Sequence, residues 1–511
     1  MRYGFVIDQN RCIGCHACTV ACKEEHNVPI GVYRTWVKYI EKGEFPDTKR
    51  YFSVLRCNHC DDAPCIEICP TVALFRRSDG IVDFDSERCI GCKSCMQACP
   101  YDALYIDPHT QTAAKCNFCA HRVEVGLEPA CVIVCPEQAI IAGDLDDPQS
   151  RISRLVATQK VSVRKAEKGT RPKLFYLGVD SDLLEPEKIE PQSTHLWAEK
   201  NPGEDLYALS RDKKDRSTLG AARVVYDVAH PPLWGGMIAA YLWTKSIGAG
   251  VLLLAAFLLS LGYGGETRLL HHVSPILALV FIGITTLLLI FDLKRPERFF
   301  YLLLKPNLSS WLVWGGYILI GYGLLASIWL LFGFIAGSVP TLLLWSAAIL
   351  AICAACYTAF LFAQAKGRDL WQSPLFFWQL LVQAVTAGSA ALMISGAAVQ
   401  AGAGLMNLLA KILTVSLILA LVIILGEISL THASENVKRA ATLLKKGALS
   451  GSFWGLAVGL GILLPIVLLL WSVLRDGDVF LLRLPASIFA LLGLWVFEDL
   501  WIKAGQAVPL S

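Results

Sequence analysis

The fold of the N-terminal part of this chain is decided by the stretch CIGCKSCMQACP, which runs from Cys89 to Pro100. Its spacing is C-x2-C-x2-C-x3-C-P. In this arrangement three thiolates hold one [4Fe–4S] cube and the fourth thiolate ligates a neighbouring cube. The same cysteine spacing occurs earlier in the chain, without the proline. It is formed there by Cys12, Cys15, Cys18 and Cys22.

Two further groups keep the first pair of cysteines and the closing x3-C-P but have a wider central gap. They are Cys57, Cys60, Cys65 and Cys69 before Pro70, and Cys116, Cys119, Cys131 and Cys135 before Pro136. Sixteen of the eighteen cysteines thus form four groups, and we expect four [4Fe–4S] clusters. Structural zinc would leave the closing x3-C-P unexplained. Disulfides are disfavoured because the N-terminus shows no pattern of a cleavable signal, so an oxidising compartment is not indicated.

The second half of the chain is apolar. The mean hydropathy is +0.49 and 54% of the residues are hydrophobic, while the charged residues concentrate before residue 230. Eight later runs are long enough to cross a bilayer, since a spanning helix needs roughly 20 apolar residues. They cover about 236–262, 273–292, 311–334, 341–364, 375–399, 408–430, 452–474 and 485–502. The net charge of +3 gives no indication of nucleic-acid binding.

The basic residues predict the orientation of these helices. Sixteen Lys and Arg residues lie before the first run, in the loops after the second, fourth and sixth runs, or after the last. The opposite side has four: Arg268, Lys411, Arg475 and Arg483. Cytoplasmic loops carry the excess of Lys and Arg. We therefore expect an inner (cytoplasmic) membrane protein with both termini and the cysteine-rich domain on the cytoplasmic face.

The predicted fold class is an α+β, ferredoxin-like four-cluster domain followed by an all-α integral membrane domain of eight transmembrane helices. The predicted domains are residues 1–180 for the clusters, 181–235 for a linker and membrane-docking segment, and 236–503 for the helices. The segment from Lys173 to Val179 is expected to form a short strand that closes the cluster domain. The Pro- and charge-rich stretch from Leu184 to Ser193 is interpreted as surface or linker.

Residues 1–180 resemble the four-cluster iron–sulfur subunit of the complex iron–sulfur molybdoenzyme family, which includes dimethyl sulfoxide, polysulfide and tetrathionate reductases. Residues 230–503 resemble the NrfD-type membrane subunit. The stretches that carry this second resemblance are DLKRPERF, from Asp292 to Phe299, and SSWLVWG, from Ser309 to Gly315. The two parts are usually separate chains in that family, so the fusion is a departure.

The resemblance implies a crossed pattern of ligation. Cys12, Cys15 and Cys18 take Cys135 as fourth ligand, and Cys116, Cys119 and Cys131 take Cys22. Cys57, Cys60 and Cys65 take Cys99, and Cys89, Cys92 and Cys95 take Cys69.

Ionisable residues inside membrane spans are functional candidates by default. In this chain they gather in the predicted cytoplasmic half of the helices. We expect a quinone and proton site formed by Tyr241, Lys245, Asp292, Glu427 and His432, with Gln364 and Gln383 nearby. Other roles stay open: Tyr241 as interfacial packing, Asp292 as a cap with Arg295 or Arg298, and Glu427 as a structural partner of Lys245.

The expected function is electron transfer between a separate catalytic subunit and membrane quinone, either menaquinone or ubiquinone. The resemblance implies that the partner is a molybdenum- or tungsten-bis-pterin subunit. We expect no pterin and no haem in this chain, because the histidines near the membrane lie at helix ends. The alternatives are a proton-translocating module like the alternative complex III, and an electron-transfer subunit of a membrane-bound hydrogenase.

Overall fold

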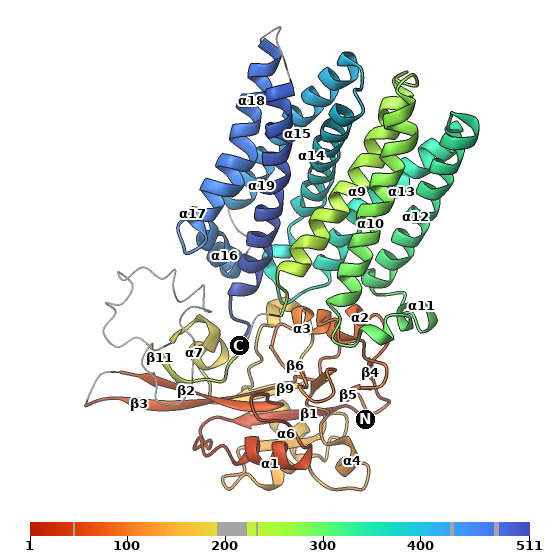
Figure 1. The fold of residues 1–511 in the computed structure, drawn as a ribbon. Coiled ribbons are helices and arrows are strands. Elements are labelled where there is room, and N and C mark those ends of the chain that lie inside the picture. The colour runs from red at the N-terminus through yellow and green to blue at the C-terminus, as the bar shows by residue number, and fades with distance from the viewer. Residues whose placement is uncertain (44–45, 192–221, 231–232, 430–433, 475–479) are drawn as a thin grey trace.

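The computed structural model describes residues 1–43, 46–191, 222–230, 233–429, 434–474 and 480–511. It consists of two stacked parts (Figure 1). The cysteine-rich domain forms the lower part and the long helices form a bundle above it. The N-terminus lies on the cysteine-rich domain, whereas the C-terminus lies where the two parts meet. This α+β domain followed by an all-α helical part is the predicted fold class.

A three-stranded sheet organises the cysteine-rich domain. Its strand order is β8 (Ile140–Asp144), β1 (Tyr3–Asp8) and β9 (Leu174–Leu177). Strand β1 is a continuous apolar run whose central residues are all buried, as expected for a strand covered on both faces. It pairs antiparallel with β8 and parallel with β9. Strand β9 is the short closing strand that the sequence predicted.

A second sheet extends beyond the predicted domain boundary at residue 180. Its order is β10 (Glu190–Pro191), β11 (Arg223–Tyr226), β2 (Thr35–Lys42) and β3 (Lys49–Arg56). The predicted linker therefore contributes strands to the cluster domain. The stretch interpreted as surface is also partly buried, since Glu187 is only 5% exposed. Local composition could not reveal this, because β11 pairs with a strand far away in the sequence.

Short elements carry the remaining cysteine loops. They are the hairpins β4 (Leu74–Arg76) with β5 (Val82–Phe84) and β6 (Leu104–Ile106) with β7 (Ala113–Lys115), and the helices α1 (Ala17–Glu25), α2 (Pro64–Ile68), α3 (Ser94–Ala98), α4 (Ala120–Val123) and α5 (Ala130–Ile133). Helices of four or five residues are not stable alone. Their position therefore depends on the cysteines and strands beside them.

The described residues contain eight helices long and apolar enough to cross a membrane, as predicted. They are α9 (Gly236–Ser260), Arg268–Phe291 including α10 (Ser274–Phe291), α12 (Trp311–Ala336), α13 (Thr341–Ala363), α14 (Leu375–Ala398), α15 (Ala403–Ser429), Ser450–Ser472 including the π-helix η7 (Phe453–Leu463) and most of α18 (Leu464–Leu474), and α19 (Phe480–Ala507). Helix α9 is the most buried of them and packs against α10, α13, α14 and α19.

Glycines allow two pairs of these helices to approach closely. A Cβ atom added to Gly250 of α9 would overlap the Ala384 carbonyl of α14, and one added to Gly388 would overlap the Gly250 backbone. Gly461 of η7 and Gly493 of α19 face each other in the same way. Small residues at such contacts are how membrane helices gain van der Waals packing without a hydrophobic driving force.

Candidate functional site: cysteine cradles and a buried polar cluster

The cysteines assemble into four quartets, each drawn from two of the sequence groups. One hollow is lined by Cys12, Cys15, Cys18 and Cys135, and another by Cys69, Cys89, Cys92 and Cys95. In the other two quartets the thiols are electrostatic neighbours. These quartets are Cys57, Cys60, Cys65 with Cys99, and Cys22, Cys116, Cys119 with Cys131. All are free thiols. This grouping is the one that the crossed ligation requires.

The backbone around the sulfur atoms suits a bound cluster. The N–H groups of Gly91 and Ala113 both donate to Cys89 Sγ at 3.4 Å, and the Ala139 N–H donates to Cys135 Sγ at 3.2 Å. Such hydrogen bonds to the sulfur atoms of a cluster help to set its potential. Gly91 has φ +69°, a left-handed conformation that residues with a Cβ rarely adopt.

Burial favours the protonated form of these thiols. Burial raises the pKa of Cys18 to about 11, and it raises the pKa of Cys99 to about 11. Protonated thiols do not ligate metal, so cluster binding must release these protons and supply the compensating positive charge. The donor set of four cysteines in each hollow fits a [4Fe–4S] cluster.

The membrane half donates hydrogen bonds to backbone carbonyls in the loops of one quartet, that of Cys69, Cys89, Cys92 and Cys95. The residues of DLKRPERF, together with Asn307, donate hydrogen bonds to carbonyls in the two cysteine loops of that quartet. These contacts are Lys294 N to Gly91 O (3.2 Å), Arg295 N to Ile90 O (3.2 Å), Arg298 Nη1 to Cys89 O (3.1 Å) and Asn307 Nδ2 to Cys69 O (2.8 Å). The quartet of Cys69, Cys89, Cys92 and Cys95 therefore lies at the bundle, whereas α1 and α4 lie at the far end of the domain (Figure 1).

Asp292 belongs to this junction. Its carboxylate accepts a hydrogen bond from Lys93 Nζ at 3.0 Å and forms an ion pair with it. Lys93 lies between two cysteines of the bundle-facing quartet and is 6% exposed. Burial raises the pKa of Asp292, and Lys93 opposes that shift only in part. The partner of Asp292 is thus Lys93, not Arg295 or Arg298 of its own loop.

Lys245 and Tyr241 lie one turn apart in α9, and both are buried. Lys245 Nζ donates to the Ala355 carbonyl and to Thr358 Oγ1 of α13, each at 2.7 Å. It lies 5.0 Å from the centroid of the Tyr357 ring. Tyr357 and Thr358 are also neighbours of Tyr241. The structure therefore brings these two predicted residues together against α13.

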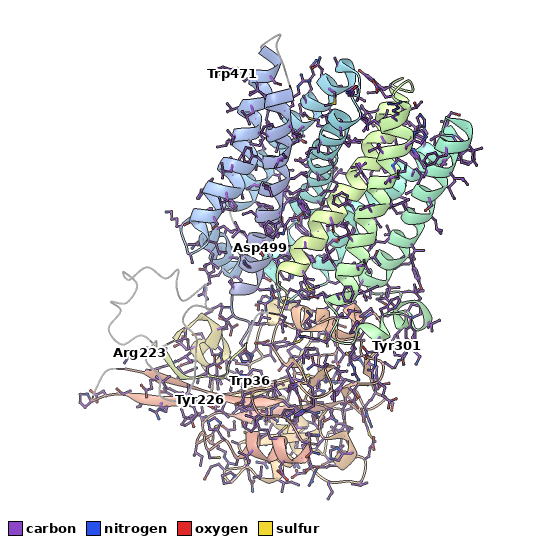
Figure 2. All side chains as sticks on the ribbon, viewed as in Figure 1. Trp36, Arg223, Tyr226, Tyr301, Trp471 and Asp499 are labelled. Carbon is purple, nitrogen blue, oxygen red and sulfur yellow. The ribbon has the colours of Figure 1, made fainter. Side chains whose placement is uncertain are left out.

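Glu498 of α19 is the acidic neighbour of Lys245, and sequence reasoning did not select it. Its side chain is 2% exposed, and neither carboxylate oxygen has a hydrogen-bond partner in the described part of the protein. Its electrostatic partner is Lys245. Figure 2 places the adjacent Asp499 in the half of α19 nearer the cysteine-rich domain. The acidic pair inside an otherwise apolar run was the signal available in the sequence.

A small hollow lies beside Phe497, which precedes Glu498, between α14, α15, η7 and α19. Its polar lining consists of Gln379, Gln383 and Thr386. The Oε1 atoms of both glutamines are buried without a partner among the described residues. The rest of the wall is apolar. An apolar cavity with a few converging polar groups is the usual form of a small-molecule site.

The remaining predicted residues lie apart from this hollow. Glu427 of α15 accepts a hydrogen bond from Ser373 Oγ at 2.7 Å rather than pairing with Lys245. Gln364 binds the backbone around Trp311, with its Oε1 accepting from Trp311 N at 3.0 Å. His432 lies outside the residues that the structure describes, so its role stays a prediction.

Comparison with known proteins finds family matches in both parts of the sequence. The polysulphide reductase NrfD family matches residues 225–509, a 4Fe-4S dicluster domain matches residues 48–145, and a 4Fe-4S binding domain matches residues 3–24. These matches confirm the iron–sulfur and NrfD-like parts that the sequence predicted.

Curated relatives resemble the first part of the protein. A tetrathionate reductase subunit of Salmonella typhimurium is 46% identical over 202 residues, which cover 39% of the present sequence and 80% of that relative. A polysulfide reductase component of Wolinella succinogenes is 44% identical over 179 residues, covering 34% of the present sequence and 93% of that relative. The Escherichia coli protein NrfC is 47% identical over 178 residues, covering 34% and 80%. Because the NrfD match alone covers more than half of the 511 residues, this protein belongs to the polysulphide reductase NrfD family, as a multi-pass member with its iron–sulfur domain fused in front.

Proposed function

We propose that this chain is the electron-transfer and quinone-reactive membrane subunit of a respiratory oxidoreductase. Four [4Fe–4S] clusters, ligated by the sixteen cysteines in the crossed pattern, carry electrons between a catalytic subunit and membrane quinone. The observation that carries the proposal is that the cysteine quartets and the polar cluster of the bundle follow one another through the protein. Cysteine quartets run from the far end of the domain to loops that contact the bundle, and a buried polar cluster lies in the bundle beyond them.

The far end of the cluster domain supports docking of a protein partner. Cys15 is exposed there, and apolar side chains on α1, α5 and the adjoining loops are exposed as well. They are Ile13, Val20, Ile30, Val125, Leu127 and Ile133. Exposed apolar patches of this kind mark protein interaction sites. We place the catalytic subunit here and propose, as the family resemblance implies, that it is a molybdenum- or tungsten-bis-pterin enzyme.

The hollow between α14, α15, η7 and α19 supports binding of the quinone head group. Reduction of a quinone to a quinol takes two electrons and two protons. The amide groups of Gln379 and Gln383 offer donors to a quinone oxygen and acceptors to a quinol hydroxyl. Lys245 has three N–H donors, of which two are used by Ala355 O and Thr358 Oγ1. Lys245 and Glu498, the residue after the lining residue Phe497, would supply a proton donor and acceptor to the bound quinone.

Protons reach this region from the side of the cluster domain in our proposal. Asp292 lies at the end of α10 on that side, where it contacts Lys93, and Glu427 lies in the last turn of α15. Both carboxylates, with His432, would carry protons inward, while Tyr241 would pass them toward Lys245. Ionisable groups within spans commonly serve as proton relays.

Two substitutions test the quinone site. We expect Lys245→Met and Glu498→Gln to lower quinone-linked turnover of the whole complex at least tenfold, about 1.4 kcal/mol of transition-state free energy. Iron content and activity with an artificial electron-accepting dye should stay unchanged, because the clusters are not touched.

The matched control is Asp499→Asn. Asp499 is adjacent to Glu498 but pairs with Lys503 at 2.6 Å on the outer side of α19, so quinone turnover should be retained. Full turnover in both Lys245→Met and Glu498→Gln would show that the quinone binds elsewhere.

The excess of basic residues on one side supports a cytoplasmic position for the cluster domain in the inner membrane. The described loops on that side contact the cysteine-rich domain, as Arg368 does by donating to Gln97 Oε1 at 2.8 Å. A topology reporter fused after Ser511 should therefore read cytoplasmic, as should one inserted near Asp212. An external signal at either point would refute the proposed face.

A further inference from the structure

Arg56, the last residue of β3, is a buried cation that has no carboxylate partner among the described residues. Its side chain is 1% exposed. Nη1 donates a hydrogen bond to Cys131 Sγ at 3.0 Å, and the guanidinium carbon lies 4.8 Å from the centroid of the Phe5 ring. Within the described residues, Nε and Nη2 have no hydrogen-bond partner. A buried guanidinium in this state would be costly unless an anion offsets its charge.

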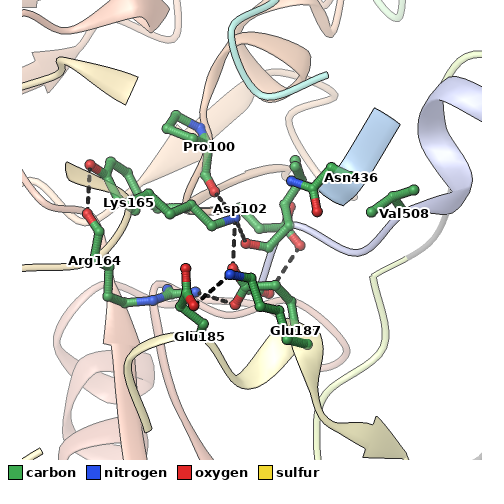
Figure 3. A network of polar contacts seen from close by, with 12 residues as sticks. Pro100, Asp102, Arg164, Lys165, Glu185, Glu187, Asn436 and Val508 are labelled. Atoms are coloured by element: carbon green, nitrogen blue, oxygen red, sulfur yellow. Dashed lines mark hydrogen bonds and ion pairs between the residues drawn. The ribbon is translucent and has the colours of Figure 1, made fainter. Parts of the chain in front are cut away.

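Three other buried cations of the same domain have carboxylate partners, whereas buried Lys115 donates to the carbonyls of Val82 and Cys116. Arg164 and Lys165 both pair with Glu187 at 3.0 Å, and Figure 3 shows the two side chains meeting at that carboxylate. Lys38 pairs with Asp227 at 2.8 Å. The fold can therefore supply a carboxylate to a buried cation, and it supplies none to Arg56 in the described part of the protein.

The cysteines around Arg56 indicate which anion would offset its charge. Its electrostatic neighbours are Cys131, Cys18 and Cys116, and it also acts on Cys22. Cys18 belongs to the quartet with Cys12, Cys15 and Cys135, whereas the other three belong to the quartet with Cys119. The guanidinium thus lies between the two quartets at the end of the domain far from the bundle.

We propose that Arg56 raises the reduction potentials of the two clusters farthest from the membrane. This inference rests on the proposed ligation of four clusters. Each cluster gains one negative charge when it accepts one electron, and no proton needs to move. A fixed cation in a low-dielectric interior stabilises that added charge, and its hydrogen bond to a ligating sulfur acts in the same direction. Arg56 is a positioning residue, because it acts through the clusters.

The test is a redox titration of the purified complex, followed by electron paramagnetic resonance. In Arg56→Met, we expect two of the four one-electron midpoint potentials to fall by at least 59 mV, a tenfold change in each reduction equilibrium. The other two should stay unchanged. Arg56→Lys keeps the charge, and its midpoints should lie between those of the wild type and Arg56→Met.

Arg164→Met is the matched control, since Arg164 is an equally buried arginine that has its own carboxylate partner. It should leave all midpoints unchanged. Unchanged midpoints in Arg56→Met, or the same shift in Arg164→Met, would overturn the inference.

Iron analysis separates this inference from the proposed function. A wild-type protein with fewer than four clusters would contradict the proposed function itself. A fully loaded Arg56→Met variant with wild-type midpoints would contradict only the role of Arg56. If Arg56→Met fails to retain iron, the midpoints of Arg56→Lys decide: two midpoints below those of the wild type support the inference, and four unchanged midpoints overturn it.

Discussion

Two sets of buried charges, one in the cluster domain and one in the bundle, are compensated differently. In the cluster domain, Lys38, Arg164 and Lys165 each form an ion pair with a carboxylate of the same domain. In the bundle, Lys245 donates to a carbonyl and a hydroxyl, and Glu498 has no hydrogen-bond partner among the described residues.

This difference indicates which buried ionisable groups can change their protonation state. A buried ion pair holds both of its partners in one charge state, which suits a domain that must keep its cysteine quartets in fixed positions. Lys245 and Glu498 are electrostatic neighbours without such an ion pair, and in the proposed function they exchange protons with a quinone. Under the proposed function, the comparison separates a rigid electron path from a site that changes its protonation.

The largest expected effect concerns metal removal. Anaerobically purified protein should contain about sixteen iron and sixteen acid-labile sulfide per chain, as four cubanes require. Extraction of the iron with a chelator and reductant should make the cluster domain sensitive to protease, because its short helices depend on the cysteines. The bundle should keep its helical circular dichroism.

Metal analysis and limited proteolysis check this prediction together. Stoichiometric zinc, or a reproducible content of about eight iron, would contradict the four-cluster interpretation. Loss of bundle helicity in parallel with the clusters would show that the two halves do not fold independently.

The next effect concerns close packing in the bundle. Gly250→Ala should destabilise the bundle by about 1–3 kcal/mol or more, because the new methyl group would overlap the Ala384 carbonyl. Gly283→Ala is the matched control, since a Cβ there meets no atom within 4 Å. Thermal unfolding of both variants in lipid nanodiscs measures the difference. Equal melting temperatures would show that α9 and α14 are not held at this contact.

A smaller effect is expected at the junction of the two halves. Asp292→Asn should cost on the order of 1–3 kcal/mol of stability, because it leaves Lys93 buried without its charged partner. Glu297→Gln, in an exposed pair with Arg295, should change stability by less than about 1 kcal/mol. Chemical denaturation of the purified protein compares the two variants, and an equal loss would argue against the junction role of Asp292.

The smallest effect concerns pH. Burial alone would lower the pKa of His230, but the Asp102 carboxylate at 2.7 Å raises it above its ordinary value. The stabilisation is therefore complete below the pKa of an unfolded histidine, about 6.5, and is lost as the pH rises through the folded pKa. We therefore expect the melting temperature of the wild type to fall across this range more than that of His230→Gln. If the melting temperatures of the wild type and His230→Gln change equally with pH, this prediction is wrong.

The sequence alone determined the four cysteine groups and the eight spans. Cluster ligation depends on residues three or four positions apart, as in Cys89 to Cys99, and the length of an apolar run decides whether a helix can cross a bilayer. Both properties are local in the sequence. For the same reason, β9 could be predicted from the short apolar run that begins at Leu174.

Only the tertiary structure decided the partners of individual charges. Lys93 and Asp292 are 199 positions apart, and Lys245 meets Glu498 rather than Glu427, although both glutamates lie in apolar helices. Strand β11 joined the cluster domain by pairing with β2 across a long separation. Such contacts depend on how whole elements pack, and no spacing within one element encodes them. The charge of Arg56, which meets no carboxylate of the described residues, is of the same kind, since it is visible only once the elements around it have packed.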